Sequence, residues 1–388
     1  MRPVSPRSDR LTEPMSSVRL LRRPDRTPLL LTTNQGLEDI TAQEFEDAAR
    51  AAGVSVAASQ ATPDGMTSYT HVVADAPRAV VLDIARSLRS IHHILAPEYT
   101  FYLPETDPLA TIRAVLSDHD VPGMSDASSF RVSTLRRGDH GFTSVDVMRA
   151  AGAGLVDRYG TDVDLEDFDL EVRVDVRGSR VRVSTQITDS ALSKRQYRVF
   201  QPPAALSPNV AYALLRLPHL TDPPGVVVDP FCGSGTIPIE AARYWPDATI
   251  VGIDRSAEVV EGARRNVAAE SLENRIHIRA GDALALQDQV QTPPDLVITN
   301  PPFGKRLGSG LDLVSFYGKL LLAVHGALPE SGWFVVLVLK PGPFSGALQD
   351  VTAAGSVSFD VRHVRRVQVG GLHPRIFVMQ KGGVRIET

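Results

Sequence analysis

The chain has 388 residues, 43% hydrophobic and 22% charged, a composition typical of globular proteins with room for two or three domains. The formal net charge of −4 gives no overall indication of nucleic-acid binding, and the single cysteine, Cys232, excludes a disulfide framework or a zinc site of several thiolates. Because no apolar run is long enough to cross a membrane and arginines interrupt the N-terminal apolar stretch, we expect a cytoplasmic protein. The ten histidines show no metal-ligand spacing, so we expect no metal site.

Residues 1–28 are predicted to be a disordered, basic tail. They contain seven arginines, three acidic residues and five prolines, and they show no hydrophobic periodicity. We interpret this segment as a solvated tail rather than a binding arm.

Two small α+β regions are predicted after the tail. Residues 29–105 form the first, a ferredoxin-like region, with strands near 29–33, 66–74 and 91–103 and helices near 37–48 and 76–88. Residues 106–199 form the second, with helices at 108–116 and 144–159 and strands at 130–135, 170–176 and 180–187. Ser144 is the expected N-cap of the helix at 144–159.

A proline-rich linker at 200–208 leads into residues 209–388, where strands and helices alternate regularly. Strands are expected near 225–229, 249–253, 276–280, 295–298 and 332–339, and helices near 236–244, 256–268 and 312–328. Repeated strand–helix units of this kind predict an α/β domain with a doubly wound parallel sheet.

A glycine-rich turn, residues 229–236, follows the first strand of this domain and opens a helix. Its glycines allow a ligand to approach the backbone closely, and the helix N-terminus offers free N–H groups. A tight strand–helix turn without a ligand would have the same appearance. We interpret Cys232, which lies inside this turn, as a small packing residue.

Two aspartates follow the next two strands. Asp254 lies about 20 residues beyond Gly235, where a carboxylate can accept both hydroxyls of a cofactor ribose. Asp282 could accept from an adenine amine, although either residue could instead cap a helix or loop. These features do not exclude a nicotinamide dehydrogenase, but Pro238 occupies the position of the third glycine that such enzymes use.

The fourth motif, Asn300-Pro301-Pro302-Phe303, follows the strand at 295–298. Hydride transfer does not require this motif, whereas methylation of an amine does. An asparagine oxygen and a backbone carbonyl can accept the two N–H bonds of an exocyclic base amine, prolines hold that carbonyl in place, and an aromatic ring can stack on the base. Catalysis of this kind depends on positioning and electrostatics.

In order and spacing, these four motifs resemble those of class I S-adenosylmethionine-dependent N-methyltransferases. The segments 229–242 and 300–306 look most like those of THUMP-domain RNA guanine-N2 methyltransferases, particularly the enzymes of the tRNA acceptor stem, and the segments 32–38, 130–132 and 192–198 support the resemblance. It implies a Rossmann-like methyltransferase domain at 209–388, preceded by a ferredoxin-like region and a THUMP-like RNA-binding domain at 106–199. It also implies S-adenosyl-L-methionine as cofactor and RNA, with tRNA favoured, as partner.

The motifs and the resemblance together define the expected site. The target base is expected to contact Asn300, Pro301, Pro302 and Phe303. The expected cofactor-binding residues are Asp229, Pro230, Cys232, Gly233, Gly235, Thr236, Asp254, Arg255, Asp282, Ala283 and Asn300.

Local clusters of positive charge are expected to contact RNA phosphates without reading sequence. These residues are Lys194, Arg195, Arg198, Lys305, Arg306, Arg365 and Arg366. Each cluster taken singly is also explained by a solvated surface, except Lys305-Arg306, which adjoins the expected base pocket.

Several alternatives stay open. The substrate could be ribosomal RNA, or DNA methylated at adenine N6 or cytosine N4, because the fourth motif suits any exocyclic amine. A protein of another class, an RNA-binding maturation factor that keeps the fold without turnover, would bind tRNA but not the cofactor.

Overall fold

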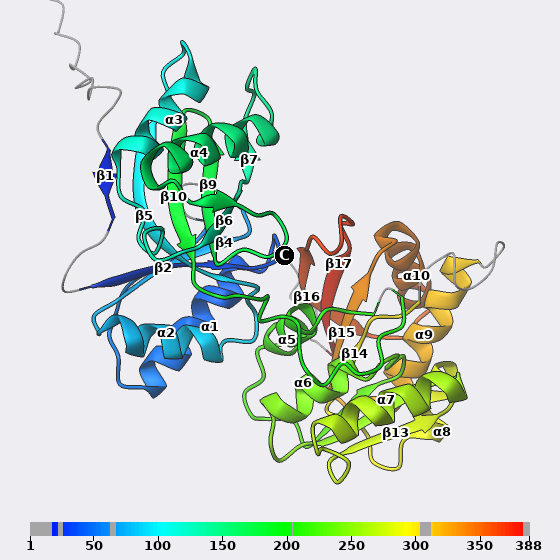
Figure 1. The fold of residues 1–388 in the computed structure, drawn as a ribbon. Helices are drawn as coiled ribbons and strands as arrows, with labels where there is room; N and C mark the ends of the chain where they lie inside the picture. The colour runs from blue at the N-terminus through cyan, green and yellow to red at the C-terminus, as the bar shows by residue number, and fades with distance from the viewer. Residues whose placement is uncertain (1–17, 22–25, 63–66, 204, 303–311, 383–388) are drawn as a thin grey trace, which may run out of the picture. The chain divides into compact units, whose positions relative to one another are not determined.

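The computed structural model describes residues 18–21, 26–62, 67–203, 205–302 and 312–382 (Figure 1). Two compact units are formed by the described residues. Unit 1 comprises the described residues within 1–32, 45–86 and 93–189, and unit 2 comprises those within 33–44, 87–92 and 190–388. Two short segments of the N-terminal half therefore belong to the same unit as the C-terminal half.

Unit 1 is built on one sheet, to which the described residues contribute ten strands. The main order is β3-β4-β2-β5-β10-β9-β6-β8, with β1 beside β5 and β7 beside β9. The antiparallel pairing of β5 with β10 joins the two predicted α+β regions into a continuous sheet. The strands are β1 (Arg19–Leu20), β2 (Thr27–Thr32), β3 (Val56–Ala61), β4 (Tyr69–Ala74), β5 (Ile94–Tyr102), β6 (Ser129–Ser133), β7 (Arg136–Arg137), β8 (Asp162–Val163), β9 (Leu170–Arg177) and β10 (Arg180–Gln186).

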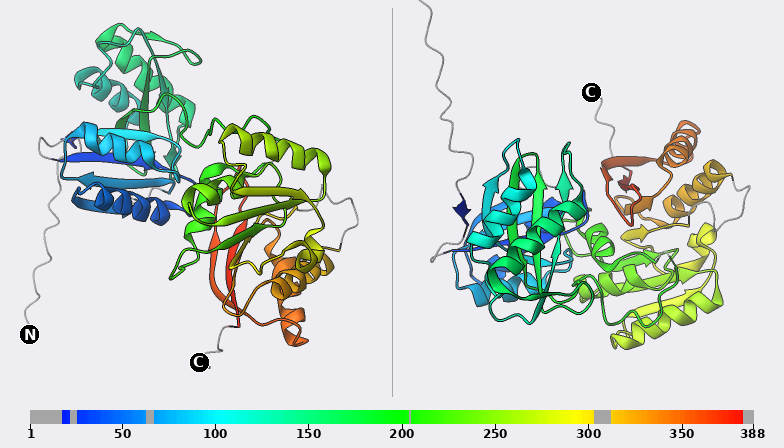
Figure 2. Two further views of the ribbon diagram at one scale, coloured as in Figure 1. Left: turned by 90° about the horizontal axis from the view of Figure 1, so that it is seen from below. Right: turned by 45° about the horizontal axis from the view of Figure 1, so that its top comes forward.

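Four helices accompany this sheet: α1 (Glu38–Ala51), α2 (Arg78–Ser87), α3 (Pro108–Asp118) and α4 (Ser144–Tyr159). Ile112 of α3, Leu155 of α4 and the strand residue Val172 are buried in one core cluster. Figure 2 shows the helices of this unit lying against its sheet. The prediction that Ser144 is the N-cap of α4 is wrong. Thr143 is the cap, because its hydroxyl accepts from the Asp146 N–H while the Asp146 carboxylate accepts from the Thr143 N–H.

The predicted disordered tail also needs a correction. Arg19 and Leu20 pair with Thr100 and Tyr99 at the side of β5, and the Leu21 N–H donates to the Glu98 carbonyl at 2.9 Å. Residues 18–21 are therefore part of the sheet, because backbone pairing needs no hydrophobic periodicity in the added strand.

Unit 2 contains a second sheet, with seven strands among the described residues, in the order β13-β12-β11-β14-β15-β17-β16. The five strands from β11 to β15 are parallel, as predicted, whereas β17 and β16 are antiparallel. The strands are β11 (Val226–Asp229), β12 (Thr249–Asp254), β13 (Ile276–Ala280), β14 (Leu296–Thr299), β15 (Trp333–Val338), β16 (Phe359–Arg366) and β17 (Arg375–Lys381).

Helices cover both faces of the unit 2 sheet. One face packs on α5 (Pro208–Arg216), α6 (Thr236–Tyr244) and α7 (Ala257–Ala269). The other packs on η2 (Ala283–Ala285), α8 (Leu286–Gln289), α9 (Leu313–Ala327) and α10 (Pro341–Ala353).

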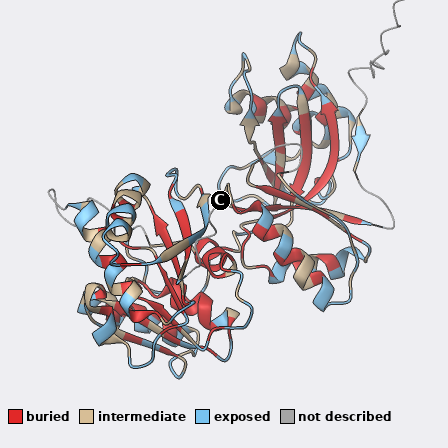
Figure 3. Cartoon of the chain, turned by 180° about the vertical axis from the view of Figure 1, so that it is seen from behind, coloured by how far each residue is buried: buried red, intermediate tan, exposed pale blue. Residues whose placement is uncertain are grey.

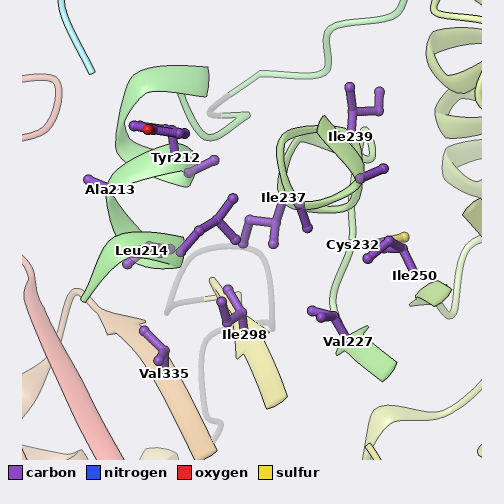
Figure 4. Packing of buried hydrophobic residues seen from close by; sticks show 14 of the residues in the cluster. Tyr212, Ala213, Leu214, Val227, Cys232, Ile237, Ile239, Ile250, Ile298 and Val335 are labelled. Carbon is purple, nitrogen blue, oxygen red and sulfur yellow. The ribbon is translucent and has the colours of Figure 1, made fainter. Parts of the chain in front are cut away.

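Adjacent strand residues of unit 2 point to opposite faces, as strand geometry requires. Val227 packs with Ile237 of α6 in one core cluster (Figure 4), and Val228 packs with Tyr317 of α9 in the other. Burial on both faces explains the nearly continuous apolar sequence of these strands. Buried residues concentrate in the strands and on the inner sides of the helices in each unit (Figure 3). No helix in the described ranges is long and apolar enough to cross a membrane.

Candidate active site

The loops that follow the parallel strands of unit 2 line a cavity of about 1070 Å³. Parallel strands end at one edge of their sheet, so motifs far apart in sequence meet there. The predicted residues in its wall are Asp229, Pro230, Cys232, Gly233, Thr236, Asp254, Arg255, Asp282, Ala283, Asn300, Pro301 and Pro302. Gly235 lies just outside the wall, whereas Phe303, Lys305 and Arg306 lie outside the described residues.

The glycine-rich turn forms the wall between β11 and α6. Gly233 has a φ of 52°, and a Cβ added to it would meet no atom within 4 Å, so this backbone borders open space. Helix α6 begins after Gly235 and has no side-chain hydrogen bond at its cap among the described residues. The N–H groups of its first turn are therefore available to a polar ligand.

Cys232 anchors the same turn. Its backbone N–H donates to the Ile253 carbonyl at 2.8 Å, and its side chain is 5% exposed and belongs to the core beside α6 (Figure 4). Burial, together with the negative charges of Asp229 and Asp254, raises the pKa of the thiol well above its usual value. A thiol that stays protonated is suited to packing and not to nucleophilic attack.

Asp229 connects the turn to the strand that carries the fourth motif. Its carboxylate accepts from the Thr299 hydroxyl at 2.7 Å and from the Phe231 N–H at 3.1 Å, and both Asp229 and Thr299 are buried. Burial raises the pKa of Asp229 to about 7; the hydrogen bonds from Thr299 and Phe231 oppose this increase, and the charge of Asp254 adds to it.

This pKa predicts a pH-dependent stability. Between about pH 4 and pH 7 the folded chain holds a proton that an unfolded aspartate has lost, so stability falls as pH rises through this window. Relative to Asp229→Asn, the wild-type free energy of unfolding should fall by about 1.4 kcal/mol per pH unit across the window, then stay level. Urea unfolding of both proteins from pH 4.5 to 8 measures this difference. A difference that does not change with pH would contradict the assignment.

Asp254 and Asp282 lie at the ends of the two neighbouring strands. Asp254 accepts from the Gly233 N–H at 3.2 Å and from the Ser256 N–H at 3.0 Å, so the turn fixes the orientation of its carboxylate. Asp282 is exposed and accepts from the Leu284 N–H at 3.0 Å through one oxygen. The described residues provide no partner for its second oxygen.

Asn300 follows β14 directly and is partly exposed in the cavity wall, while Pro301 is buried beside it. Within the described part of the chain, no hydrogen bond engages the Asn300 carboxamide. Its oxygen can therefore accept an N–H of a ligand that enters the cavity.

The donors and acceptors of this cavity fit a nucleoside cofactor. Carboxylates at the ends of β12 and β13 suit the hydroxyls of a ribose and the amine of an adenine, and the open backbone at Gly233 leaves room for close approach. The described residues contain no group of three or more potential metal ligands.

The predicted RNA-contacting residues that the structure describes are not part of the cavity wall, and their surroundings differ. Lys194 and Arg366 are exposed, and Arg198 is partly buried. Arg195 lies 3.5 Å from the buried Glu240 and donates to the Arg89 carbonyl at 2.8 Å. Arg365 forms a two-pronged ion pair with Asp39, at 2.5 and 2.7 Å. Internal partners thus engage Arg195 and Arg365.

The segment predicted as a linker is hydrogen-bonded to helix α7 and contributes to the cavity wall. The Asn266 side chain accepts from the Phe200 N–H and donates to the Phe200 and Ser234 carbonyls, each at 2.8 Å. Pro202 and Leu206 then line the cavity. Sequence reasoning missed this contact because a lone asparagine within a helix gives no indication of its partners.

Other wall residues were also missed, among them Phe316, Leu339, Lys340 and Leu372. For two of these a sequence signal existed. Leu339 and Lys340 stand where the predicted strand 332–339 ends, at the same sheet edge as the four motifs.

Comparison with known proteins gives matches for both halves. Residues 195–375 match the family described as RMKL-like, methyltransferase domain, and residues 110–186 match the THUMP domain. The tRNA (guanine(6)-N2)-methyltransferase of Thermus thermophilus is 34% identical over 355 residues, 90% of this chain and 98% of the relative. The enzyme of the same name from Methanocaldococcus jannaschii is 30% identical, covering 65% of this chain and 75% of that protein.

A solved structure is similar over nearly the whole chain. The crystal structure of TrmN from Thermus thermophilus matches with a TM-score of 0.74 and 33% identity, over 92% of this chain and 99% of that one.

Proposed function

The chain belongs to the THUMP-domain-containing RNA (guanine-N2) methyltransferases, and we propose that it methylates the N2 amine of guanosine 6 in tRNA. The observation that carries the proposal is that Asn300 shares one cavity with Asp254 and Asp282. This supports a proposed amine acceptor beside a proposed nucleoside-binding end. The guanosine position comes from the names of both relatives.

We propose that S-adenosyl-L-methionine occupies the β12–β13 end of the cavity, held by Asp254, Asp282 and the backbone of the glycine-rich turn. When bound, it supplies an electrophilic methyl group. Asn300 Oδ1 accepts one N–H of the guanine amine, and the rigid Pro301-Pro302 backbone fixes the direction from which the amine enters. These residues lower the barrier by orientation, without a covalent intermediate on the protein.

Fewer residues are proposed to contact RNA than were predicted from the sequence. Lys194 and Arg366 are exposed and can neutralise phosphates, whereas Arg195 and Arg365 are engaged internally. We propose that residues 106–199 bind RNA, that residues 209–388 hold the cofactor and that the protein works in the cytoplasm.

Nucleoside analysis tests the proposed function. Purified protein is incubated with labelled S-adenosylmethionine and unmodified tRNA, ribosomal RNA or duplex DNA, and the products are digested. Label in N2-methylguanosine from tRNA is the expected result. If the label is found in ribosomal RNA alone or in a DNA base, the substrate is ribosomal RNA or DNA instead of tRNA. If the protein binds RNA but not the cofactor, it is better explained as a maturation factor.

We expect Asp254→Asn to weaken S-adenosylmethionine binding by about 10–100-fold, because a hydrogen bond to a charged group contributes about 1.5–3 kcal/mol. Calorimetric titration measures the affinity. The exposed Asp247 lies outside the described cavity wall, so Asp247→Asn serves as the matched control and should bind as the wild type does. Equal S-adenosylmethionine affinities for all three proteins would show that Asp254 does not contribute to cofactor binding.

A further inference from the structure

The cavity has two chemically different ends. At the β12–β13 end its wall carries Asp254, Arg255 and Asp282, which suit the hydroxyls and amine of a nucleoside. Where β15 and the hairpin between β16 and β17 reach the cavity, the wall carries the apolar Leu339 and Leu372, and Lys340 is the one charged residue there among those described.

Leu372 is presented by a tight hairpin between β16 and β17. Val369 and Leu372 exchange backbone hydrogen bonds of 2.9 Å, and Gly370 and Gly371 between them have φ values of 54° and 78°. Two consecutive residues with positive φ form the hairpin turn that favours glycine. The turn holds Leu372 with 49% of its surface exposed.

The base of this hairpin is tied to the segment at 33–44 of unit 2. The Asn34 side chain donates to the Gln368 carbonyl at 2.8 Å, and the Gln368 N–H donates to the Gln35 carbonyl at 2.9 Å. The hairpin is therefore fixed at its base while its apolar tip faces the cavity. An apolar side chain that is held in the wall of a cavity can pack against a ligand that enters it.

Lys340 lies two residues beyond β15, which is the neighbour of β14, the strand that Asn300 follows. It is exposed, and the described residues offer its ammonium group no ion pair or hydrogen bond. It also occupies the N-cap position of α10 without a side-chain cap hydrogen bond. Stability does not explain a lysine there, because N-caps favour small polar residues and a cation opposes the helix dipole.

We infer that this end of the cavity is the subsite of the target nucleotide, in which Leu372 packs against the base and Lys340 pairs with an adjacent phosphate. An apolar wall next to a single cation matches a nucleotide, which joins a flat apolar face to an anion. The inference rests on the proposed function, and it adds two substrate-contacting residues that the four motifs do not include.

Leu372→Ala tests the base contact. We expect the KM for a tRNA transcript to rise about tenfold from the lost apolar contact, with S-adenosylmethionine affinity unchanged, and Leu372→Met to stay close to the wild type. Leu322→Ala is the matched control, because Leu322 is 44% exposed on α9 and outside the described cavity wall. If Leu372→Ala has the wild-type KM while its thermal melting is normal, Leu372 does not contact the substrate.

Lys340→Ala tests the phosphate contact through salt dependence. Filter binding of the tRNA transcript over a range of salt concentrations should give a slope of log affinity against log salt that is shallower by about 0.7–0.9 than for the wild type. Lys340→Arg should keep the wild-type slope, as should the control Lys319→Ala on α9. An unchanged slope for Lys340→Ala would overturn the phosphate contact.

The two proposals can fail separately. If the wild-type protein methylates tRNA and all four Leu372 and Lys340 variants match it in KM and salt slope, only the subsite is wrong. If the wild-type protein methylates no RNA, the proposed function itself fails.

Discussion

Replacing Asn300 with alanine should lower kcat for RNA methylation by about 10²–10³-fold while leaving the affinity for S-adenosylmethionine within about twofold. Asn300 has no hydrogen-bond partner among the described residues, so its carboxamide is free to orient the target amine, and the predicted cofactor carboxylates lie on other strands. A positioning contact made in the transition state affects the rate more than the binding of the other substrate.

The comparison needs a single-turnover assay for the rate and a titration for the cofactor. Asn274→Ala is a matched control, because Asn274 is exposed in a loop outside the described cavity wall and should retain wild-type rate and affinity. A parallel loss of rate and cofactor affinity in Asn300→Ala would mean that Asn300 holds the cofactor instead of the amine.

The second large effect concerns stability. Glu240 of α6 is fully buried, and it accepts two hydrogen bonds from the Arg89 guanidinium, at 2.6 and 2.8 Å, and one from the Tyr197 hydroxyl at 2.9 Å. We expect Glu240→Ala to lower the free energy of unfolding by about 3–5 kcal/mol, because it leaves a partly buried arginine without its counter-charge.

Urea unfolding measures this change. Glu261→Ala, which removes an exposed carboxylate from the neighbouring helix α7, should cost less than about 0.5 kcal/mol. Glu240→Gln keeps hydrogen-bond acceptors, so it should lie between the two, and it provides a measurement if the alanine variant does not fold. A loss below about 1 kcal/mol for Glu240→Ala would show that Arg89 and Tyr197 find other partners.

The same cluster shows why linear domain boundaries describe unit 2 incompletely. Arg89 and Glu240 are 151 positions apart, and no periodicity in either segment indicates that they meet. Residues 33–44 and 87–92 belong to unit 2, so a chain cut near residue 199 would lose Arg89 and leave Glu240 buried without its strongest partner.

Elements with strong local patterns were predictable. Helix α6 and strand β13 have the predicted bounds, because a glycine-rich turn indicates where α6 begins and the alternation of Ile276 and Ile278 with polar residues indicates β13. Strand β16 was missed since its sequence is polar and it lies exposed at the sheet edge, and α10 was missed because it contains two prolines and two glycines. Helix α5 was not predicted, and it is buried almost throughout.

The site residues, too, were predictable only where the sequence carries a local pattern. Motifs at the carboxyl ends of parallel strands could be predicted to meet, and Asp254, Asp282 and Asn300 do line one cavity. The roles assigned to them stay predictions. Residues brought there by tertiary packing, such as Leu372 on its hairpin and Pro202 near the Asn266 contact, have no such marker in the sequence.

Methylation of guanosine 6 is tested with one tRNA transcript and its variant in which guanosine 6 is replaced by adenosine. Each is incubated with the protein and S-adenosylmethionine, digested and examined by mass spectrometry. We predict N2-methylguanosine at position 6 of the first transcript and no methylation of the second. Equal methylation of both transcripts, or a methyl group on any other atom, would contradict this prediction.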